Sequence, residues 1–124
     1  MTVKSLDEYR TYRRSVVGAR ILVVDDDSTV RMIVQQFLKN AGFTVTVATS
    51  GEEAFQCLEK KVFDLMLLDI LMPDVTGFDV LEKIRQKYSK LELLVIMVTM
   101  KEESADMLKA FSLGANDYVV KPID

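Results

Sequence analysis

The chain has 124 residues, of which 49% are hydrophobic and 28% are charged, with five Gly and two Pro. This length fits one compact domain, and the composition is that of a globular protein rather than a disordered or collagen-like chain. The chain has no His and a single cysteine, Cys57. These counts exclude a Ser-His-Asp triad, an imidazole zinc site, a phosphohistidine carrier and an intramolecular disulfide. Any chemistry must come from carboxylates, hydroxyls and lysines, and we interpret Cys57 as a buried small hydrophobe.

The net charge of -3 is unevenly distributed along the chain. Residues 1–20 carry five basic and two acidic side chains, and residues 21–124 carry eleven basic and seventeen acidic ones. An acidic body repels nucleic acid, so we expect no direct nucleic-acid binding. No apolar run approaches the length of about 18 residues that spans a bilayer, and the N-terminus lacks the apolar segment of a signal peptide. We expect a soluble, cytoplasmic protein that does not contact membranes.

From residue 20 onward, short apolar runs alternate with amphipathic stretches, which is typical of a wound β/α sheet. The apolar runs predict strands at 20–24, 43–48, 64–68, 93–98 and 116–120. Apolar residues spaced three and four apart predict a first helix that begins at Asp27 or Ser28 and ends at Gly42. Weaker patterns predict helices near 51–60, 77–88 and 101–113, the last ending at Gly114.

The strands differ in how apolar their two faces are. The first, third and fourth are apolar on both faces, whereas residues 43–48 alternate as a half-exposed strand does. Short connections through helices require parallel strands with right-handed crossovers. We therefore predict the α/β class, with a doubly wound, flavodoxin-like parallel sheet of five strands in the order 2-1-3-4-5 and the second strand at an edge.

Polar residues end or follow four of these strands. They are Asp25, Asp26, Asp27, Asp69, Thr99 and Lys121. Ligands of such sheets bind beyond the carboxyl ends of the strands, and neighbouring strands lie about 4.8 Å apart, so we expect these side chains to converge.

Converging carboxylates favour a shared cation. Two of them about 5 Å apart repel by roughly 3 kcal/mol at an effective dielectric of 20. A site with oxygen ligands and no His or Cys points to Mg²⁺ or Mn²⁺, which binds phosphate in its remaining positions. A carboxylate beside such an ion can act as the nucleophile and form an acyl phosphate. The sequence therefore predicts a magnesium site that handles phosphate.

Four ordered motifs carry a family resemblance. VVDDDSTVR, LLDILMPDVTG, MVTM and GANDYVVKP, between residues 20 and 122, resemble the response-regulator receiver domain of two-component signalling, the CheY-like family. The resemblance implies a phosphoacceptor signalling domain that takes a phosphoryl group from a histidine kinase or a histidine phosphotransfer protein and then switches conformation. It also implies a regulatory domain rather than an enzyme, although one that assists its own phosphorylation and dephosphorylation.

The resemblance also assigns roles to individual residues. Asp69 is the implied phosphoacceptor. The implied Mg²⁺ ligands are Asp25, Asp26, Asp69 and the backbone carbonyl of Leu71. Thr99 and Lys121 are implied to contact the phosphoryl group, and Tyr118 to turn inward when Thr99 moves towards it. The Lys121–Pro122 bond is usually cis in the family, in keeping with the low cost of a cis bond before proline.

This chain departs from the family pattern at three places. Leu71 stands where many members carry a polar residue that orients water, and Met100 stands where a small residue is common, so we expect slow hydrolysis of a phosphoaspartate. The sequence ends at Asp124, before the fifth helix that normally follows. Residues 1–19 are expected to be a helical extension of the receiver domain at 20–124.

The N-terminal leader offers a replacement for the fifth helix. Ser5 and Glu8 form a capping box, and Gly18 suits a C-terminal cap. An apolar stripe within the predicted helix 6–17 comprises Leu6, Tyr9, Tyr12 and Val16. We expect this helix to pack on the sheet face that also carries the first helix, or else to be a solvated basic arm or an unrelated upstream helix. A homodimer is left open.

Alternatives to these assignments remain at this point. The three acids at 25–27 could merely cap the first helix, Thr99 and Lys121 could be ordinary strand-end residues, and Tyr118 could be core packing. The segment DDDST also matches the DxDx[TV] signature of a haloacid-dehalogenase-type phosphatase, in which Asp25 would be the nucleophile. A third function is a phosphate-independent adaptor that keeps the fold without switching.

Overall fold

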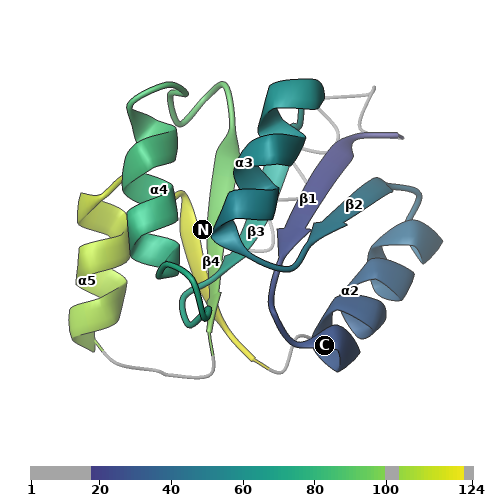
Figure 1. Ribbon diagram of the computed structural model, residues 1–124, viewed down its shortest axis with the longest axis horizontal. Helices are drawn as coiled ribbons and strands as arrows, with labels where there is room; N and C mark the ends of the chain where they lie inside the picture. Colours follow the sequence, from purple (N-terminus) through teal and green to yellow (C-terminus); the bar gives the residue numbers. More distant parts are fainter. Residues whose placement is uncertain (1–17, 100–103, 122–124) are drawn as a thin grey trace.

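The structure, a computed structural model, describes residues 18–99 and 104–121. Its strands pair in parallel as one sheet in the order β2-β1-β3-β4-β5, which confirms the predicted fold class and the edge position of the second strand (Figure 1). The strands are β1 (Arg20–Val24), β2 (Thr44–Ala48), β3 (Leu65–Asp69), β4 (Leu94–Thr99) and β5 (Asp117–Val120). The helices are α2 (Ser28–Asn40), α3 (Gly51–Lys60), α4 (Gly77–Arg85) and α5 (Ser104–Ser112).

Several predicted boundaries were wrong by a few residues. The third and fourth strands each begin and end one residue later than predicted, so Asp69 and Thr99 are the last residues of their strands rather than the residues that follow. The helix predicted at 77–88 ends at Arg85, where the Lys87 N–H donates to the carbonyl of Ile84, three residues back, in a turn tighter than that of an α-helix. The second strand begins at Thr44, because the Phe43 N–H donates to the carbonyl of Leu38 instead of to the sheet.

The ends of α2 follow the predicted capping chemistry. The carboxylate of Asp27 accepts hydrogen bonds from the N–H groups of Thr29 and Val30, which have no partner inside the helix. At the other end, Gly42 has a φ of 96°, a conformation that costs glycine little. Of the three adjacent acids, Asp27 is therefore the one that caps the helix.

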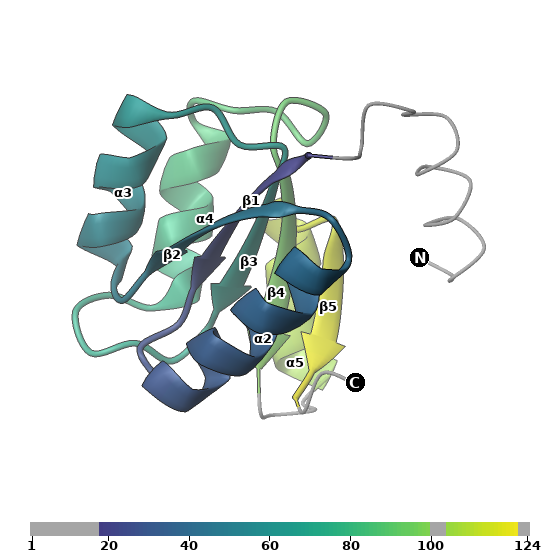
Figure 2. The same ribbon diagram turned by 90° about the vertical axis from the view of Figure 1, so that its right-hand side faces the viewer.

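The helices cover the two faces of the sheet unequally (Figure 2). Helices α3, α4 and α5 pack on one face over a large core that includes Met66, Leu68 and Met97, while α2 packs on the other face against Ile21 and Val23. Cys57 is half-buried at the border of the larger core. Burial, together with the charge of Glu53, raises the pKa of its thiol, so Cys57 is a protonated, mainly apolar side chain at neutral pH.

Some predictions fall on residues that the structure does not describe. The helix predicted at 6–17, the Met100 side chain and Pro122 lie outside the described residues. Within residues 18–99 and 104–121, no helix has both the length and the apolar character needed to cross a bilayer.

Candidate functional site

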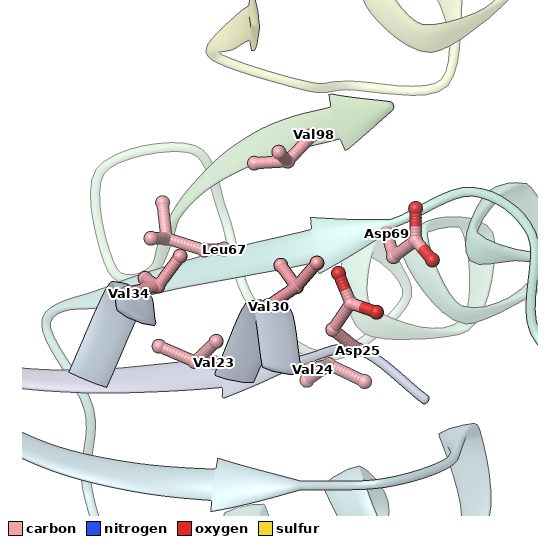
Figure 3. A pocket seen from close by; sticks show the side chains of 8 residues that line it. All are labelled: Val23, Val24, Asp25, Val30, Val34, Leu67, Asp69 and Val98. Carbon is pink, nitrogen blue, oxygen red and sulfur yellow. The ribbon is translucent and has the colours of Figure 1, made fainter. Parts of the chain in front are cut away.

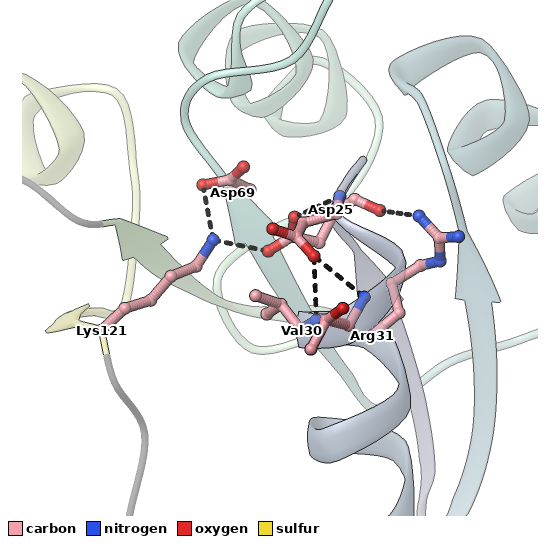
Figure 4. Close-up of polar contacts among 7 residues, drawn as sticks. Asp25, Val30, Arg31, Asp69 and Lys121 are labelled. Carbon is pink, nitrogen blue, oxygen red and sulfur yellow. Dashed lines mark hydrogen bonds and ion pairs between the residues drawn. The ribbon is translucent and has the colours of Figure 1, made fainter.

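Three strands bring charged side chains together at the carboxyl edge of the sheet. Asp25 follows β1, Asp69 ends β3 and Lys121 follows β5. The Lys121 Nζ lies 2.6 Å from the Asp25 Oδ2 and 3.4 Å from the Asp69 Oδ1, so one ammonium bridges both carboxylates (Figure 4). Asp25 and Asp69 are only 4% and 6% exposed. The predicted convergence of these three residues is confirmed.

Asp25 is fixed by three further hydrogen-bonding groups. Its N–H donates to the Ala48 carbonyl on the neighbouring strand, and its Oδ1 accepts from the Asp27 N–H at 2.9 Å. The Arg31 Nη1 donates to the Asp25 carbonyl at 2.8 Å from one turn into α2. Arg31 was not predicted as a site residue, although it stands six residues after Asp25 and on the first turn of the predicted helix.

The position of Asp69 depends on the close approach of α4. The Gly77 N–H donates to the Ile70 carbonyl at 2.7 Å, immediately after Asp69. A Cβ atom at Gly77 would collide with the backbone carbonyl oxygen of Asp69. Thr76 and Asp79 cap α4 at this point with a reciprocal capping box. Glycine is therefore required for α4 to begin directly against the strand end that carries Asp69.

The other predicted site residues surround this centre. Thr99 ends β4 with 1% of its surface exposed, and its carbonyl accepts from the Lys121 N–H at 2.7 Å. Leu71 lies two residues beyond Asp69, with a side chain that is 56% exposed. Tyr118 is buried in the core shared with α3, α4 and α5, so its ring already faces inward in this conformation.

The surroundings of Asp69 favour its neutral form. Burial raises the pKa of Asp69 to about 6, and the nearby charge of Asp25 adds to this effect, while Lys121 opposes it. Burial alone would lower the pKa of Lys121, but its hydrogen bond to Asp25 and the charge of Asp69 outweigh burial and raise that pKa. Negative charge is therefore crowded at Asp69 even with the lysine in place.

The carboxylates can supply ligands for a metal ion. One oxygen from each of Asp25, Asp26 and Asp69 lies within 4.8 Å of the other two. Asp26 is exposed, whereas the other two are buried, so the cluster opens to solvent on one side. An all-oxygen donor set with excess negative charge suits a hard divalent cation such as Mg²⁺.

A small apolar cavity lies beneath the two buried aspartates (Figure 3). Its volume is about 10 Å³, which is room for roughly one water molecule. Val30 and Val34 of α2 line it from one side, and Leu67 and Val98 line it from the sheet. Apolar side chains thus lie directly behind the Asp25 and Asp69 carboxylates.

Comparisons with known proteins agree with this geometry. The model of the response regulator receiver domain family matches residues 21–124. The chain belongs to this family. It is 40% identical over 108 residues to the regulatory protein VanRc of Enterococcus gallinarum, covering 87% of this chain and 46% of that protein. It is 39% identical over 102 residues to the response regulator SaeR of Staphylococcus aureus, covering 82% and 43%. This receiver domain therefore spans less than half the length of these relatives.

Solved receiver structures share the fold. The response regulator TrrA of Thermotoga maritima, in complex with Mg²⁺-BeF, is 34% identical with a TM-score of 0.75, and the match covers 86% of this chain and 89% of that one. The chemotaxis protein CheY4 of Vibrio cholerae is 31% identical with a TM-score of 0.81, and the match again covers 86% and 89%. The chain is thus a receiver domain of two-component signalling in both sequence and fold.

Two structural residues outside the site were not anticipated. The Asp74 carboxylate accepts from the N–H groups of Gly51 and Glu52, so the loop after β3 caps α3 from a distance. Arg85 donates to the carbonyls of Gly114 and Leu93 and to the side chain of Asn116, which joins α4 to the amino-terminal ends of β4 and β5. Neither contact could be predicted from neighbouring residues. Most of the partners lie more than 20 residues away in the sequence, and the nearer one, Leu93, takes part only through its uncharged backbone carbonyl.

Proposed function

We propose that Asp69 of this receiver domain accepts a phosphoryl group from a phosphohistidine of a histidine kinase or a histidine phosphotransfer protein. An Asp69 Oδ atom attacks the phosphorus, the bond from phosphorus to the imidazole nitrogen breaks, and the imidazole keeps the electron pair and takes up a proton. The observation that carries this proposal is the Lys121 ammonium placed between the buried Asp25 and Asp69 carboxylates. This cation is positioned to pair with the oxygens of a phosphoryl group on Asp69.

The acidic cluster is the proposed Mg²⁺ site. Asp25, Asp26, Asp69 and the backbone carbonyl of Leu71 would hold the ion, and Mn²⁺ could replace it. The three converging carboxylate oxygens support this assignment. When bound, the ion would offset the charge of the phosphoryl oxygens. The protein itself orients Asp25 through the Arg31 and Asp27 hydrogen bonds, so the cluster is held in place by the fold.

The remaining residues have proposed roles in the switch. The Thr99 side chain would hydrogen-bond the phosphoryl group, and its movement would alter the packing of Tyr118 one strand away. The paired register of β4 and β5, in which Met97 faces Tyr118 and Thr99 faces Val120, supports this link. Phosphorylation would thus change the conformation of the protein surface near Tyr118 and would not convert a substrate. We therefore propose a regulatory domain and not an enzyme.

Intact-mass analysis with acetyl phosphate tests this function. We expect a mass gain of one phosphate that requires Mg²⁺ and is lost in Asp69→Asn, because an amide is not a nucleophile. Asp27→Asn is the matched control, since Asp27 caps α2, and it should still be labelled. Labelling that survives in Asp69→Asn but is lost in Asp25→Asn would favour the phosphatase, and no labelling in any variant would favour the phosphate-independent adaptor.

A further inference from the structure

Asp74, in the loop between β3 and α4, connects this loop to the start of α3. Its Oδ1 accepts from the Gly51 N–H at 3.3 Å, and its Oδ2 accepts from the Glu52 N–H at 3.1 Å. The first N–H groups of a helix have no partner inside it. The Ser50 hydroxyl accepts from the next of them, the Glu53 N–H, at 3.2 Å. Two side chains thus cap the same helix end, and of these two, Asp74 comes from a different loop.

The charge of Asp74 suits this contact. Desolvation alone would raise the pKa of Asp74, but hydrogen bonds from the N–H groups of Glu52, Val75 and Gly51 outweigh it and lower that pKa. The carboxylate is therefore ionised at neutral pH, beside the positive end of the helix dipole. Asp74 is exposed, so hydrogen bonds rather than burial hold it in place. A Cβ atom at Gly51 would collide with the Val75 side chain, which shows that the loop and the helix start are in close contact.

The loop that Asp74 holds also carries part of the proposed metal site. It follows Asp69 directly and ends at Gly77, whose N–H donates to the Ile70 carbonyl at 2.7 Å. Leu71 comes next after Ile70, and its backbone carbonyl is a ligand of the proposed Mg²⁺ site. The Leu71 side chain is 56% exposed, so it does not anchor the loop in the core. The place of this carbonyl therefore depends on anchors elsewhere in the loop.

The anchors of this loop lead to different parts of the fold. Met72 packs half-buried against the larger core, and Thr76 caps α4. The hydrogen bonds of Asp74 lead instead to α3, which begins three residues after the end of β2. The last residue of β2, Ala48, accepts from the Asp25 N–H through its carbonyl. Asp74 thus connects the loop after β3 to the segment that also holds the loop after β1.

We propose that Asp74 is a positioning residue of the metal site, which holds the loop between β3 and α4 against α3 so that the Leu71 carbonyl is placed for Mg²⁺. This inference rests on the Mg²⁺ site proposed above. Mg²⁺ requires near-ideal octahedral geometry, so a small displacement of one oxygen ligand weakens its binding. Residues that orient metal ligands commonly contribute roughly 10–100-fold to metal affinity. Asp74 acts through the backbone, so we expect the lower end of this range.

Direct metal binding tests this role, with Mn²⁺ as the probe and its electron paramagnetic resonance signal as the readout. Asp74→Ala should weaken Mn²⁺ binding about 10-fold. Ser50→Ala is the matched control, because it removes a cap from the same helix end. Both variants should lower Tm by about 2–6 °C, since each loses one cap. Ser50→Ala should nevertheless keep the affinity within about twofold of the unmodified chain, because Ser50 does not hold the loop after β3.

Two further variants separate the possible causes of a loss. Glu52→Gln removes a negative charge from the same turn of α3 and should change Mn²⁺ affinity less than about twofold, because exposed charges are screened. Asp26→Ala removes a proposed ligand and should abolish binding. If the unmodified chain binds Mn²⁺ and Asp26→Ala does not, but Asp74→Ala binds normally, the metal site stands and the role of Asp74 is overturned.

Other results would also overturn this role. An equal loss of affinity in Asp74→Ala and Ser50→Ala would assign the effect to fraying of α3, and an equal loss in Asp74→Ala and Glu52→Gln would assign it to charge. No Mn²⁺ binding by the unmodified chain would overturn the metal site and this inference together.

The unmodified chain provides a second test, because coupling between two binding events is reciprocal. If the Asp74 contact strengthens Mg²⁺ binding, saturating Mg²⁺ must strengthen the contact by the same factor. Exchange of the Glu52 amide hydrogen with water, measured by NMR, should therefore slow about 10-fold when Mg²⁺ is added, whereas amides at the C-terminal end of α3 should not slow to this extent. An unchanged rate at Glu52, or equal slowing along all of α3, would overturn the proposal.

Discussion

At the scale of single residues, Asp69 is a buried carboxyl whose pKa is shifted by the fold. It is buried beside Asp25, and burial raises its pKa to about 6. Its pKa in the unfolded chain is near 3.9. The folded state therefore holds the Asp69 proton more tightly than the unfolded state, and ionised Asp69 destabilises the metal-free fold above pH 6. This penalty disappears as the pH falls from 6 to below 4, because Asp69 is then protonated in both states.

Replacement of Asp69 should expose this pH dependence. Without divalent cations, we expect Asp69→Asn to be more stable than the unmodified chain at pH 7.5, on the order of 1–2 kcal/mol, and the difference to vanish towards pH 4. One pKa unit corresponds to about 1.4 kcal/mol, reduced here because solvent reaches the site. Urea unfolding across this pH range is the measurement, with Glu82→Gln on the exposed side of α4 as the control. An advantage that is constant with pH would refute the linkage.

Leu71 bears on the lifetime of the proposed phosphoaspartate. Hydrolysis needs a water in line with the bond from Asp69 to phosphorus, and an apolar side chain offers that water no hydrogen bond. Leu71→Asn should therefore accelerate the loss of phosphate several-fold, as followed by intact mass after removal of the phosphodonor. Val75→Asn, further along the same loop, is the control. A lifetime that is unchanged or longer in Leu71→Asn would contradict this role.

At the scale of elements, the start of α4 sets the position of Asp69. Gly77→Ala places a methyl group against the Asp69 carbonyl, so the helix or the strand end must shift. We expect a loss of about 1–3 kcal/mol in the free energy of unfolding and slower phosphoryl uptake, because the nucleophile moves with its backbone. Denaturant unfolding and the rate of the mass gain measure the two effects. Glu82→Ala, exposed on the same helix, should change neither, and normal uptake by Gly77→Ala would show that α4 does not position Asp69.

The elements also show which features the sequence could and could not predict. Apolar runs ended by acids predicted β1 and β3, because buried parallel strands must be apolar on both faces and their ends meet at one edge. Asp27 was foreseeable as a cap, since its contacts lie within three residues. The Asp74 cap on α3 and the Arg85 contacts to β4 and β5 were not, because each joins segments that only the folded chain brings together.

At the scale of the whole molecule, the acidic cluster lies next to the packing between α2 and the sheet. The carboxyl edge of the sheet holds the acidic cluster and Lys121, while α2 packs on one face of the sheet against Ile21 and Val23. The small apolar cavity lined by Val30 and Val98 lies between them and touches both Asp25 and Asp69. Packing of α2 on the sheet can therefore influence the support of the proposed phosphoacceptor, Asp69, without direct contact with its carboxylate oxygens.

The central claim is that Asp69, and no other acid in the cluster, carries the phosphoryl group. Reduction with borohydride converts an acyl phosphate to an alcohol, so a phosphorylated aspartate becomes homoserine and is located by peptide sequencing in a mass spectrometer. After treatment with acetyl phosphate and Mg²⁺, we predict homoserine at position 69 and unmodified aspartate at positions 25 and 26. Homoserine at position 25, or at no position in a chain that has gained the mass of a phosphate, would contradict the assignment.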